Sequence, residues 1–352
     1  MIEWIVEENI ALQQELDALV RRLAGQSPYL LSSWRRAVRA AYGYASGALI
    51  WREAGEVQGF LAYCRVKDLF GRSQAVALPY CDIGGPVAIS ADIAAALTAF
   101  FANTVCKSQP KGGELRLQDP APIVDEQQLT GKKVNMLLAL PDSEEALLAG
   151  YPPKLRSQIK KASKNGLNAQ VRTDASGLDD FYLVYSRNMH RLGSPAHSKA
   201  WFAAVLHEYQ QHGEAILALV YLEQQVVGAA IVLRCGEQAV IPWASTLAEY
   251  NSLAPNMLLY WSVQAWLCQN GVRVFDFGRS TYGEGTYKFK KQWGATAGLL
   301  VWQRFDQTGQ LISPAAVTSQ GKLREMAEQV WRILPEPLMT AVGSGLRRYI
   351  TL

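Results

Sequence analysis

A stretch near the C-terminus, DFGRSTYGEGTYKFKKQWG at residues 276–294, stands out for side chains that could do chemistry. Its glycines permit positive φ and close backbone approach to a ligand. Cationic and aromatic side chains are interleaved around and after them: Arg279, Tyr282, Tyr287, Lys288, Phe289, Lys290, Lys291 and Trp293. This composition suits a phosphate loop, a nucleic-acid patch, a solvated turn or the rim of a transferase cleft.

The glycines at positions 283 and 285 do not make a dinucleotide-binding fingerprint, because the third glycine and the following helix of that motif are missing. The nearby Arg279 follows Asp276 at the end of a predicted strand. The two could pair and shape the turn, or Arg279 could bind a substrate.

The segment TYKFKKQW has two conformational alternatives. In an extended segment, Tyr287, Phe289 and Lys291 share one face, and Lys288 and Lys290 lie on the other. In a helical turn, Tyr287 becomes a neighbour of Lys290 or Lys291 instead.

Several reaction classes are disfavoured. No GxSxG elbow is present, and the five scattered cysteines form no evident Cys/His constellation. Most of the cysteines lie in apolar runs, which predicts buried, reduced thiols and no metal site. The remaining possibility is direct attack of an amine on an activated carbonyl, which needs a positioned, unprotonated amine and stabilisation of the oxyanion.

The length of 352 residues favours two domains. Each half shows a hairpin, a third strand, a helix and a further strand. In both halves the third strand ends in aliphatic-Pro-aromatic, at Pro79 and at Pro242. We therefore predict an α+β chain of two tandem domains of the Gcn5-related N-acetyltransferase (GNAT) type, residues 1–130 and 131–352, each a mixed, mostly antiparallel sheet flanked by helices. Two unrelated α+β domains with similar hairpins are the alternative.

A basic helix is predicted at residues 152–165, opened by Pro152-Pro153 and closed by Asn165-Gly166. It carries Lys154, Arg156, Lys160, Lys161 and Lys164. The helix is either a solvated surface element or an electrostatic rim for a phosphorylated or nucleic-acid substrate. A further helix is predicted near the C-terminus.

The formal net charge of +4 is too small for a dedicated nucleic-acid binder, so no DNA partner is predicted. The N-terminus lacks the pattern of a signal peptide, and the apolar runs are interrupted well before the ~18 residues of a membrane span. These features predict a cytoplasmic protein with no transmembrane segment.

The motifs RLGSP (191–195), PWAS (242–245), LAPNMLLYW (253–261) and FDFGRSTYGEGTYKFKKQWG together resemble the FemAB family. More narrowly, with SPYLLSSWRRAVRAAYGY and LPYCDIGGPV in the first half, they are similar to its branch associated with the exosortase/PEP-CTERM system. The resemblance implies tandem GNAT-like domains and the transfer of an amino acid from aminoacyl-tRNA to an amine of a peptidoglycan precursor. For that branch, it implies envelope or exopolysaccharide metabolism.

The resemblance also implies site residues. The lysine of the family's Tyr-x-Phe-Lys motif, tied to transition-state charge, falls on Lys290, the predicted catalytic residue. An arginine near the precursor's phosphates falls on Arg191, and a phosphate-pairing cation falls on Arg35, Arg36 or Arg39, of which we take Arg36. The remaining predicted substrate-binding residues are Arg279, Tyr287, Phe289, Lys288, Trp243, Lys154 and Arg156. The general base is left open among Asp276, Glu249 and Glu284.

Three functions compete. The first is aminoacyl or acyl transfer to an amine of a phosphorylated, UDP- or lipid-linked envelope precursor. The second is N-acylation of amino sugars from acyl-CoA or an acyl-carrier protein, which is weakened because the acetyl-CoA loop pattern Arg/Gln-x-x-Gly-x-Gly/Ala is absent from 245–256. The third is an inactive binding scaffold. We predict no tightly bound cofactor, with aminoacyl-tRNA or acyl-CoA as a co-substrate.

Overall fold

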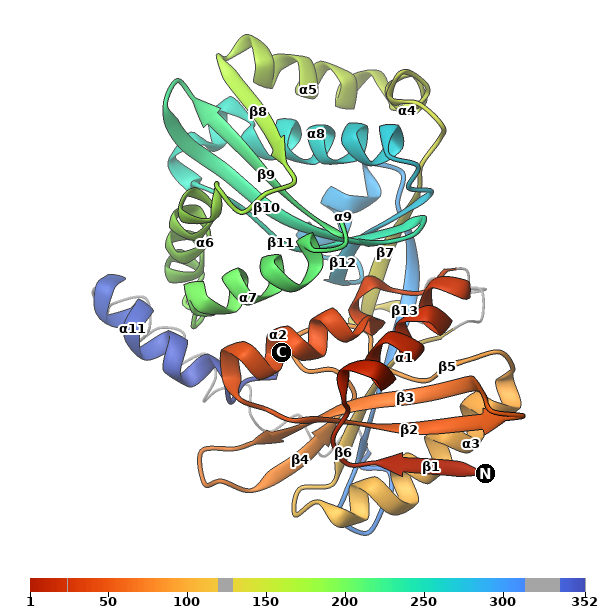
Figure 1. Cartoon of the computed structure of the whole chain (residues 1–352). Coiled ribbons are helices and arrows are strands. Elements are labelled where there is room, and N and C mark those ends of the chain that lie inside the picture. Colours follow the sequence, from red (N-terminus) through yellow and green to blue (C-terminus); the bar gives the residue numbers. More distant parts are fainter. Residues whose placement is uncertain (24, 120–128, 314–335, 352) are drawn as a thin grey trace. The chain divides into compact units, whose positions relative to one another are not determined.

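The structure is a computed structural model that describes residues 1–23, 25–119, 129–313 and 336–351. The chain forms two compact units (Figure 1). The described part of unit 1 comprises residues 1–23, 25–119, 300–313 and 347–351, and that of unit 2 comprises residues 129–299 and 336–346.

Unit 1 is a mixed sheet with helices on both faces. Its strand order is β1-β2-β3-β4-β6-β13, with β5 paired to β3. In Figure 1, α1 and α2 lie on one face and α3 on the other. The elements are β1 (Ile2–Ile5), α1 (Ile10–Arg22), η1 (Pro28–Leu30), α2 (Ser32–Tyr42), β2 (Ser46–Glu53), β3 (Glu56–Lys67), β4 (Ser73–Val76), β5 (Val87–Ala88), α3 (Ala91–Phe100), η2 (Phe101–Val105), η3 (Cys106–Ser108) and β6 (Gly113–Gln118).

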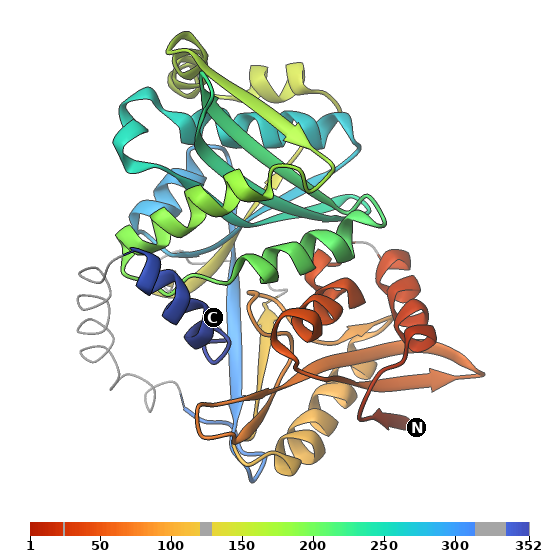
Figure 2. The ribbon, with the colours of Figure 1, turned by 60° about the vertical axis from the view of Figure 1, so that its left-hand side comes forward.

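Unit 2 repeats this plan with the strand order β13-β7-β12-β11-β10-β9-β8. Figures 1 and 2 show α6 and α7 along one face of this sheet and α8 along the other. The elements are β7 (Lys133–Ala139), α4 (Glu144–Gly150), α5 (Pro153–Lys164), β8 (Leu167–Arg172), α6 (Leu178–Leu192), α7 (Lys199–Gln210), β9 (Ala215–Leu222), β10 (Gln225–Cys235), β11 (Gln238–Thr246), η5 (Ala248–Leu253), α8 (Pro255–Gln269), β12 (Val274–Thr281), α9 (Gly285–Lys291) and α11 (Glu336–Arg347).

Strand β13 (Thr296–Phe305) contributes to both sheets. Its first residues, Thr296–Leu299, pair with β7, and Leu300–Phe305 pair with β6 of unit 1. The C-terminal Thr351 also lies in unit 1, where its carbonyl accepts a hydrogen bond from the Tyr80 amide at 2.7 Å. The predicted division of the chain into residues 1–130 and 131–352 stays a prediction. That division does not include the return of residues 300–305 to unit 1.

The two units share a split between two parallel strands. In unit 1, β4 pairs with β6 only at Ala75 and Val76. In unit 2, β11 pairs with β12 only from Gln238 to Val240. The prolines predicted to mark equivalent positions, Pro79 and Pro242, follow these last pairs within three residues, where a residue without an N–H group costs no ladder bond.

The predicted mixed α+β fold of tandem units is confirmed, and local signals set several boundaries. The hairpin between β9 and β10 turns at Glu223 and Gln224, and Glu223 takes a positive φ of 53°. Helix α3 begins after Ser90, whose side chain accepts from the Ile93 amide. Helix α5 begins at Pro153 and ends at Lys164, as the Pro-Pro and Asn-Gly signals predict.

An apolar core of unit 2 lies between its sheet and α8, around Val263, Leu267 and Phe275, which are all fully buried. The five cysteines are free and buried, as the apolar runs predict. No described helix combines the length and the apolar character needed to cross a bilayer.

Candidate active site

The split between β11 and β12 is the structural feature on which the site is built. Beyond Val240 and Asp276 the two strands separate, and each continues with a different neighbour: β11 with β10 as far as Thr246, and β12 with β7 as far as Thr281. Backbone groups of β11 that point into the split therefore have no strand partner in the described chain. Main-chain N–H and C=O groups outside a ladder need partners of another kind.

A bulge in β12 lies at the start of the split. The register with β7 shifts between Asp276 and Arg279, and Gly278 takes a φ of 74°. The Gly278 amide donates to Oδ1 of Asp276 at 2.8 Å, and Asn135 Nδ2 donates to Oδ2 at 3.3 Å. A side chain at Gly278 would be strained, so the glycine is needed for the bend itself.

Lys290 fixes this bulge from α9. Its side-chain nitrogen donates to the carbonyls of Gly278 and Arg279, both at 2.9 Å, and the residue is only 8% exposed. The sequence left the conformation of TYKFKKQW open, and the structure makes it helical. Because α9 begins at Gly285, the expectation that no helix follows the glycines at 283 and 285 is wrong. The helix directs both Tyr287 and Lys290, three residues apart, into the protein.

Lys290 lines neither the cavity at the end of β11 nor the cavity between β8 and α8. Its acceptors at the bulge are backbone carbonyls, so the geometry gives it a positioning role there. The catalytic role implied by the family resemblance stays a prediction. Arg279 is half-buried at the same bulge, and its part in substrate binding also stays a prediction.

The other predicted residues of α9 have different environments. Tyr287 is buried and packs against Tyr282, with ring centroids 4.5 Å apart. Phe289 is half-buried against Tyr260, at 5.1 Å. Lys288 is exposed. The first two are therefore part of, or packed against, the core of unit 2, and Lys288 alone of these three is freely accessible to solvent.

A cavity of about 310 Å³ lies at the far end of β11. It is lined by Thr246–Glu249 after the strand and by Arg187, Asn188 and Arg191 of α6. Arg191 Nη2 donates to Asn188 Oδ1 at 2.9 Å, and Asn188 Nδ2 donates to Ser245 Oγ at 3.1 Å. Arg191 was singled out from the sequence, whereas Arg187 and Asn188 were missed because nothing local marks one turn of an amphipathic helix as cavity-lining.

Of the three carboxylates left open as a general base, Glu249 lines this cavity. Asp276 is buried and engaged at the bulge, and Glu284 is exposed at the start of α9. Trp243 lies half-buried on β11 before the cavity, with its ring against Phe202 at 5.0 Å.

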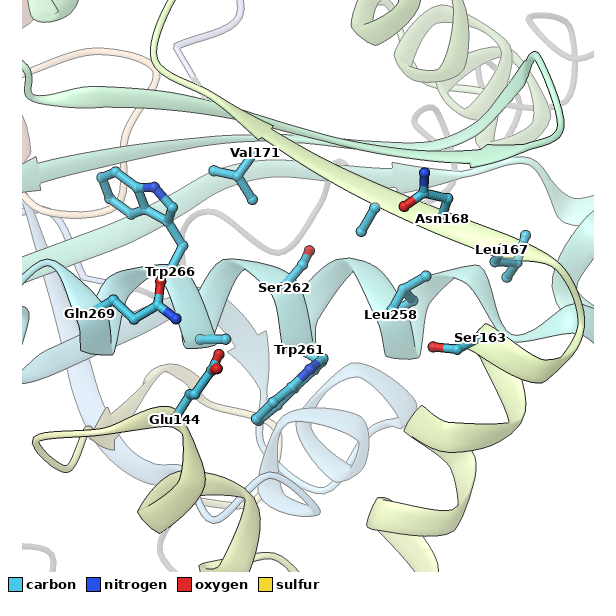
Figure 3. Close-up of a pocket in the computed structure, with 12 residues that line it drawn as sticks. Glu144, Ser163, Leu167, Asn168, Val171, Leu258, Trp261, Ser262, Trp266 and Gln269 are labelled. Carbon is cyan, nitrogen blue, oxygen red and sulfur yellow. The ribbon is translucent and has the colours of Figure 1, made fainter.

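A second cavity of unit 2, about 510 Å³, lies between β8 and α8 (Figure 3). In Figure 3, Trp266 and Ser262 rise from α8 toward β8, and Trp261 lies on the side of α8 near Glu144. Helix α5 adds Ser163 to its rim. Lys154 and Arg156 are exposed on that helix and form no ion pair with any residue that the structure describes.

The three arginines near Trp34 lie in unit 1 and differ in burial and in hydrogen-bond partners. Arg35 is fully buried and paired with Glu8 at 3.0 Å, which rules it out as an accessible phosphate ligand. Arg39 pairs with Glu7 on the surface. Arg36, the residue chosen from the sequence, is half-buried and donates to Ser32 Oγ at 2.6 Å, and its phosphate-binding role stays a prediction.

Comparison with known proteins agrees with this geometry. Residues 153–291 match the family model described as an acetyltransferase (GNAT) domain. Among curated proteins, none matches the chain. The structure of FemX is similar over 84% of this chain and 95% of that one, with 16% identity and a TM-score of 0.66.

Two further solved structures share the fold. A C-terminal domain assigned to a lysylphosphatidylglycerol synthetase from Agrobacterium fabrum covers 92% of this chain and 97% of its own, at 12% identity and a TM-score of 0.55. A tandem GNAT protein from the clavulanic acid biosynthesis pathway covers 86% and 98%, at 13% identity and a TM-score of 0.51. The FemAB-like, tandem GNAT architecture predicted from the sequence is thus confirmed.

Proposed function

We propose that the protein is an acyltransferase that moves an aminoacyl or other acyl group onto an amine of a cell-envelope precursor. Two observations carry the proposal: the split between β11 and β12, and the cavity with Arg187 and Arg191 at the end of β11. This split lies within the segment that matches a GNAT acetyltransferase domain.

The reaction would begin with attack of an unprotonated amine on the carbonyl carbon of an ester or thioester. A C–N bond forms, the C–O or C–S bond breaks, and the amine proton passes to a base. Glu249 is the proposed base because it alone of the three candidates lines the cavity. Backbone N–H groups of β11 in the split would donate to the oxyanion.

The two arginines suit a donor that carries phosphates, as both aminoacyl-tRNA and acyl-CoA do. A guanidinium group presents a planar set of donors that matches phosphate oxygens. The precursor is proposed as an envelope component because FemX and the lysylphosphatidylglycerol synthetase domain share the fold and the sequence resembles the FemAB family. The exosortase/PEP-CTERM branch remains the pathway suggested by the resemblance.

A donor panel tests the proposal. The purified protein is incubated with labelled aminoacyl-tRNA, acetyl-CoA or long-chain acyl-CoA, together with UDP-linked and lipid-linked amine acceptors, and the label on the acceptor is followed. We expect amide formation from one donor class and its loss in Arg191→Gln. The control is Arg172→Gln, because Arg172 is a half-buried arginine of the same unit that does not line this cavity. Absence of transfer from every donor would reject the proposal.

A further inference from the structure

A third cavity, of about 480 Å³, lies in unit 1 and has no part in the proposed transfer site. Gly43, Tyr44 and Ala45 line one side, directly after α2, and residues at the ends of β3, β4 and η3 line the rest: Arg65, Lys67, Ser73, Ser108 and Gln109. Its volume is within the range of small-molecule sites, roughly 300–1,000 Å³.

Two cations project into this cavity from one face of β3. Arg65 and Lys67 are two residues apart in the strand and therefore point the same way. The side chain of Arg65 makes no hydrogen bond or ion pair with the residues that the structure describes, and its Nε is buried without a partner. Lys67 is exposed and likewise has no carboxylate partner within the described ranges.

The carboxylate that follows Lys67 in the sequence, Asp68, does not neutralise Arg65 and Lys67. Asp68 accepts from Arg72 Nε at 2.9 Å and from two backbone amides, and Lys111 lies 3.5 Å from its Oδ2. Burial alone would raise the pKa of Asp68, but the hydrogen bonds from Arg72 and from the Phe70 amide together outweigh it and lower the pKa. The carboxylate is thus committed to other cations, and the cavity keeps its positive charge.

A third cation, the guanidinium group of Arg348, adds to this charge beside the cavity. The Arg348 carbon Cζ lies 5.6 Å from the centroid of the Tyr44 ring, and Arg348 Nη2 donates to the Tyr42 carbonyl at 3.0 Å. The Tyr44 hydroxyl donates to the backbone carbonyls of Lys67 and Arg348, each at 3.3 Å. These hydrogen bonds hold the Tyr44 side chain in place at the side of the cavity.

Neutral donors complete the lining. The Ser73 hydroxyl has no hydrogen bond to a described residue. Ser108 is engaged, because its hydroxyl donates to the Val105 carbonyl at 2.7 Å and accepts from Gln109 Nε2 at 2.9 Å. A buried donor without an acceptor costs free energy. Arg65 Nε is such a donor, and it lines the same cavity as the Ser73 hydroxyl and Lys67. An anionic ligand would supply acceptors for all three groups.

We infer that this cavity binds the phosphate group of a small phosphorylated molecule. Arg65 supplies the planar donor set and the buried Nε–H, Lys67 supplies a second charge from the open side, and Ser73 supplies a hydroxyl. Phosphate suits this set because an arginine with adjacent cationic and hydroxyl donors can satisfy several of its oxygens. The site lies in the unit outside the GNAT-domain match, so it does not depend on the proposed transfer reaction.

Calorimetric titration with inorganic pyrophosphate at fixed ionic strength tests the inference. We expect Arg65→Met and Lys67→Met each to weaken pyrophosphate binding at least about tenfold, the effect of losing a charged hydrogen bond. Arg72→Met removes a nearby charge that belongs to Asp68 and should leave the affinity unchanged within about twofold. Arg65→Lys keeps the positive charge but lacks the planar donor set of a guanidinium group, so this variant should bind pyrophosphate with intermediate affinity.

Two controls are added to the titration: citrate as an alternative anion, and the variant Arg187→Met. Citrate presents carboxylates in place of phosphate and should bind at least about tenfold more weakly than pyrophosphate. Arg187→Met, in the transfer-site cavity, should leave this affinity unchanged. Should Arg65→Met fail to fold, by circular dichroism, Lys67→Met and Arg65→Lys carry the test. Three results would overturn the inference. The first is a pyrophosphate affinity that does not change in these variants, and the second is an equal loss of affinity in Arg72→Met. The third is citrate binding as strong as that of pyrophosphate.

Discussion

Replacing Lys290 separates a positioning role from a purely catalytic one. Its nitrogen donates to two backbone carbonyls at the β12 bulge, each at 2.9 Å, from a site that is 8% exposed. Hydrogen bonds from charged groups contribute about 1.5–3 kcal/mol each. Lys290→Met keeps most of the side-chain volume, so the packing loss is small. We expect the free energy of unfolding to fall by about 2–4 kcal/mol, less than two full bonds because water can reach the freed carbonyls.

The assay is urea-induced unfolding followed by tryptophan fluorescence. Trp293, two residues after α9 and 1% exposed, is one of the ten tryptophans that contribute to the signal. Lys288→Met is the matched control, because Lys288 lies two residues away on the same helix and is exposed. Its unfolding should shift by less than about 0.5 kcal/mol. Equal unfolding midpoints for the two variants would refute the positioning role. A variant that is as stable as the parent but inactive would favour the role implied by the resemblance.

Three other predictions concern stability and reactivity. Arg35→Met leaves the buried carboxylate of Glu8 without its partner and should cost about 3–5 kcal/mol in chemical denaturation, whereas the exposed Arg39→Met should cost under about 0.5 kcal/mol. Burial opposes ionisation of Glu114, but two adjacent arginines outweigh it and lower its pKa below 4.5. Its contribution is therefore present above pH 4.5 and lost as the pH falls through the lowered value, so Glu114→Gln should flatten the loss of Tm below pH 4.5. Burial raises the pKa of Cys64 to about 12, so iodoacetamide at pH 8 should label it only after denaturation, as mass spectrometry would show.

Sequence reasoning succeeded where a local rule fixes the backbone. The Pro-Pro start and the Asn-Gly end of α5 are such cases, because their effect depends only on neighbouring residues. The equivalent prolines Pro79 and Pro242 indicated the repeated order of elements, and the structure places both where a strand ladder ends and a missing N–H group is tolerated.

The remaining features depend on contacts between distant residues. The burial of Lys290 requires the bulge at Gly278, and that bulge is visible only once β7 and β12 are paired. The pairing of Arg35 with Glu8 spans 27 residues, so a row of arginines on one helix could not be divided into buried and accessible members. The return of residues 300–305 to unit 1 is likewise set by long-range strand pairing.

The most direct test of the proposed function is kcat/KM for acyl transfer by Arg187→Gln/Arg191→Gln, measured against the parent protein and against Arg172→Gln. Loss of both guanidinium groups from the cavity after β11 should lower kcat/KM by about 100-fold or more, since each charged contact to a phosphate is worth about tenfold or more. The double variant should keep the unfolding midpoint of the parent. Transfer at the parental kcat/KM by the folded double variant would contradict the placement of the donor in this cavity.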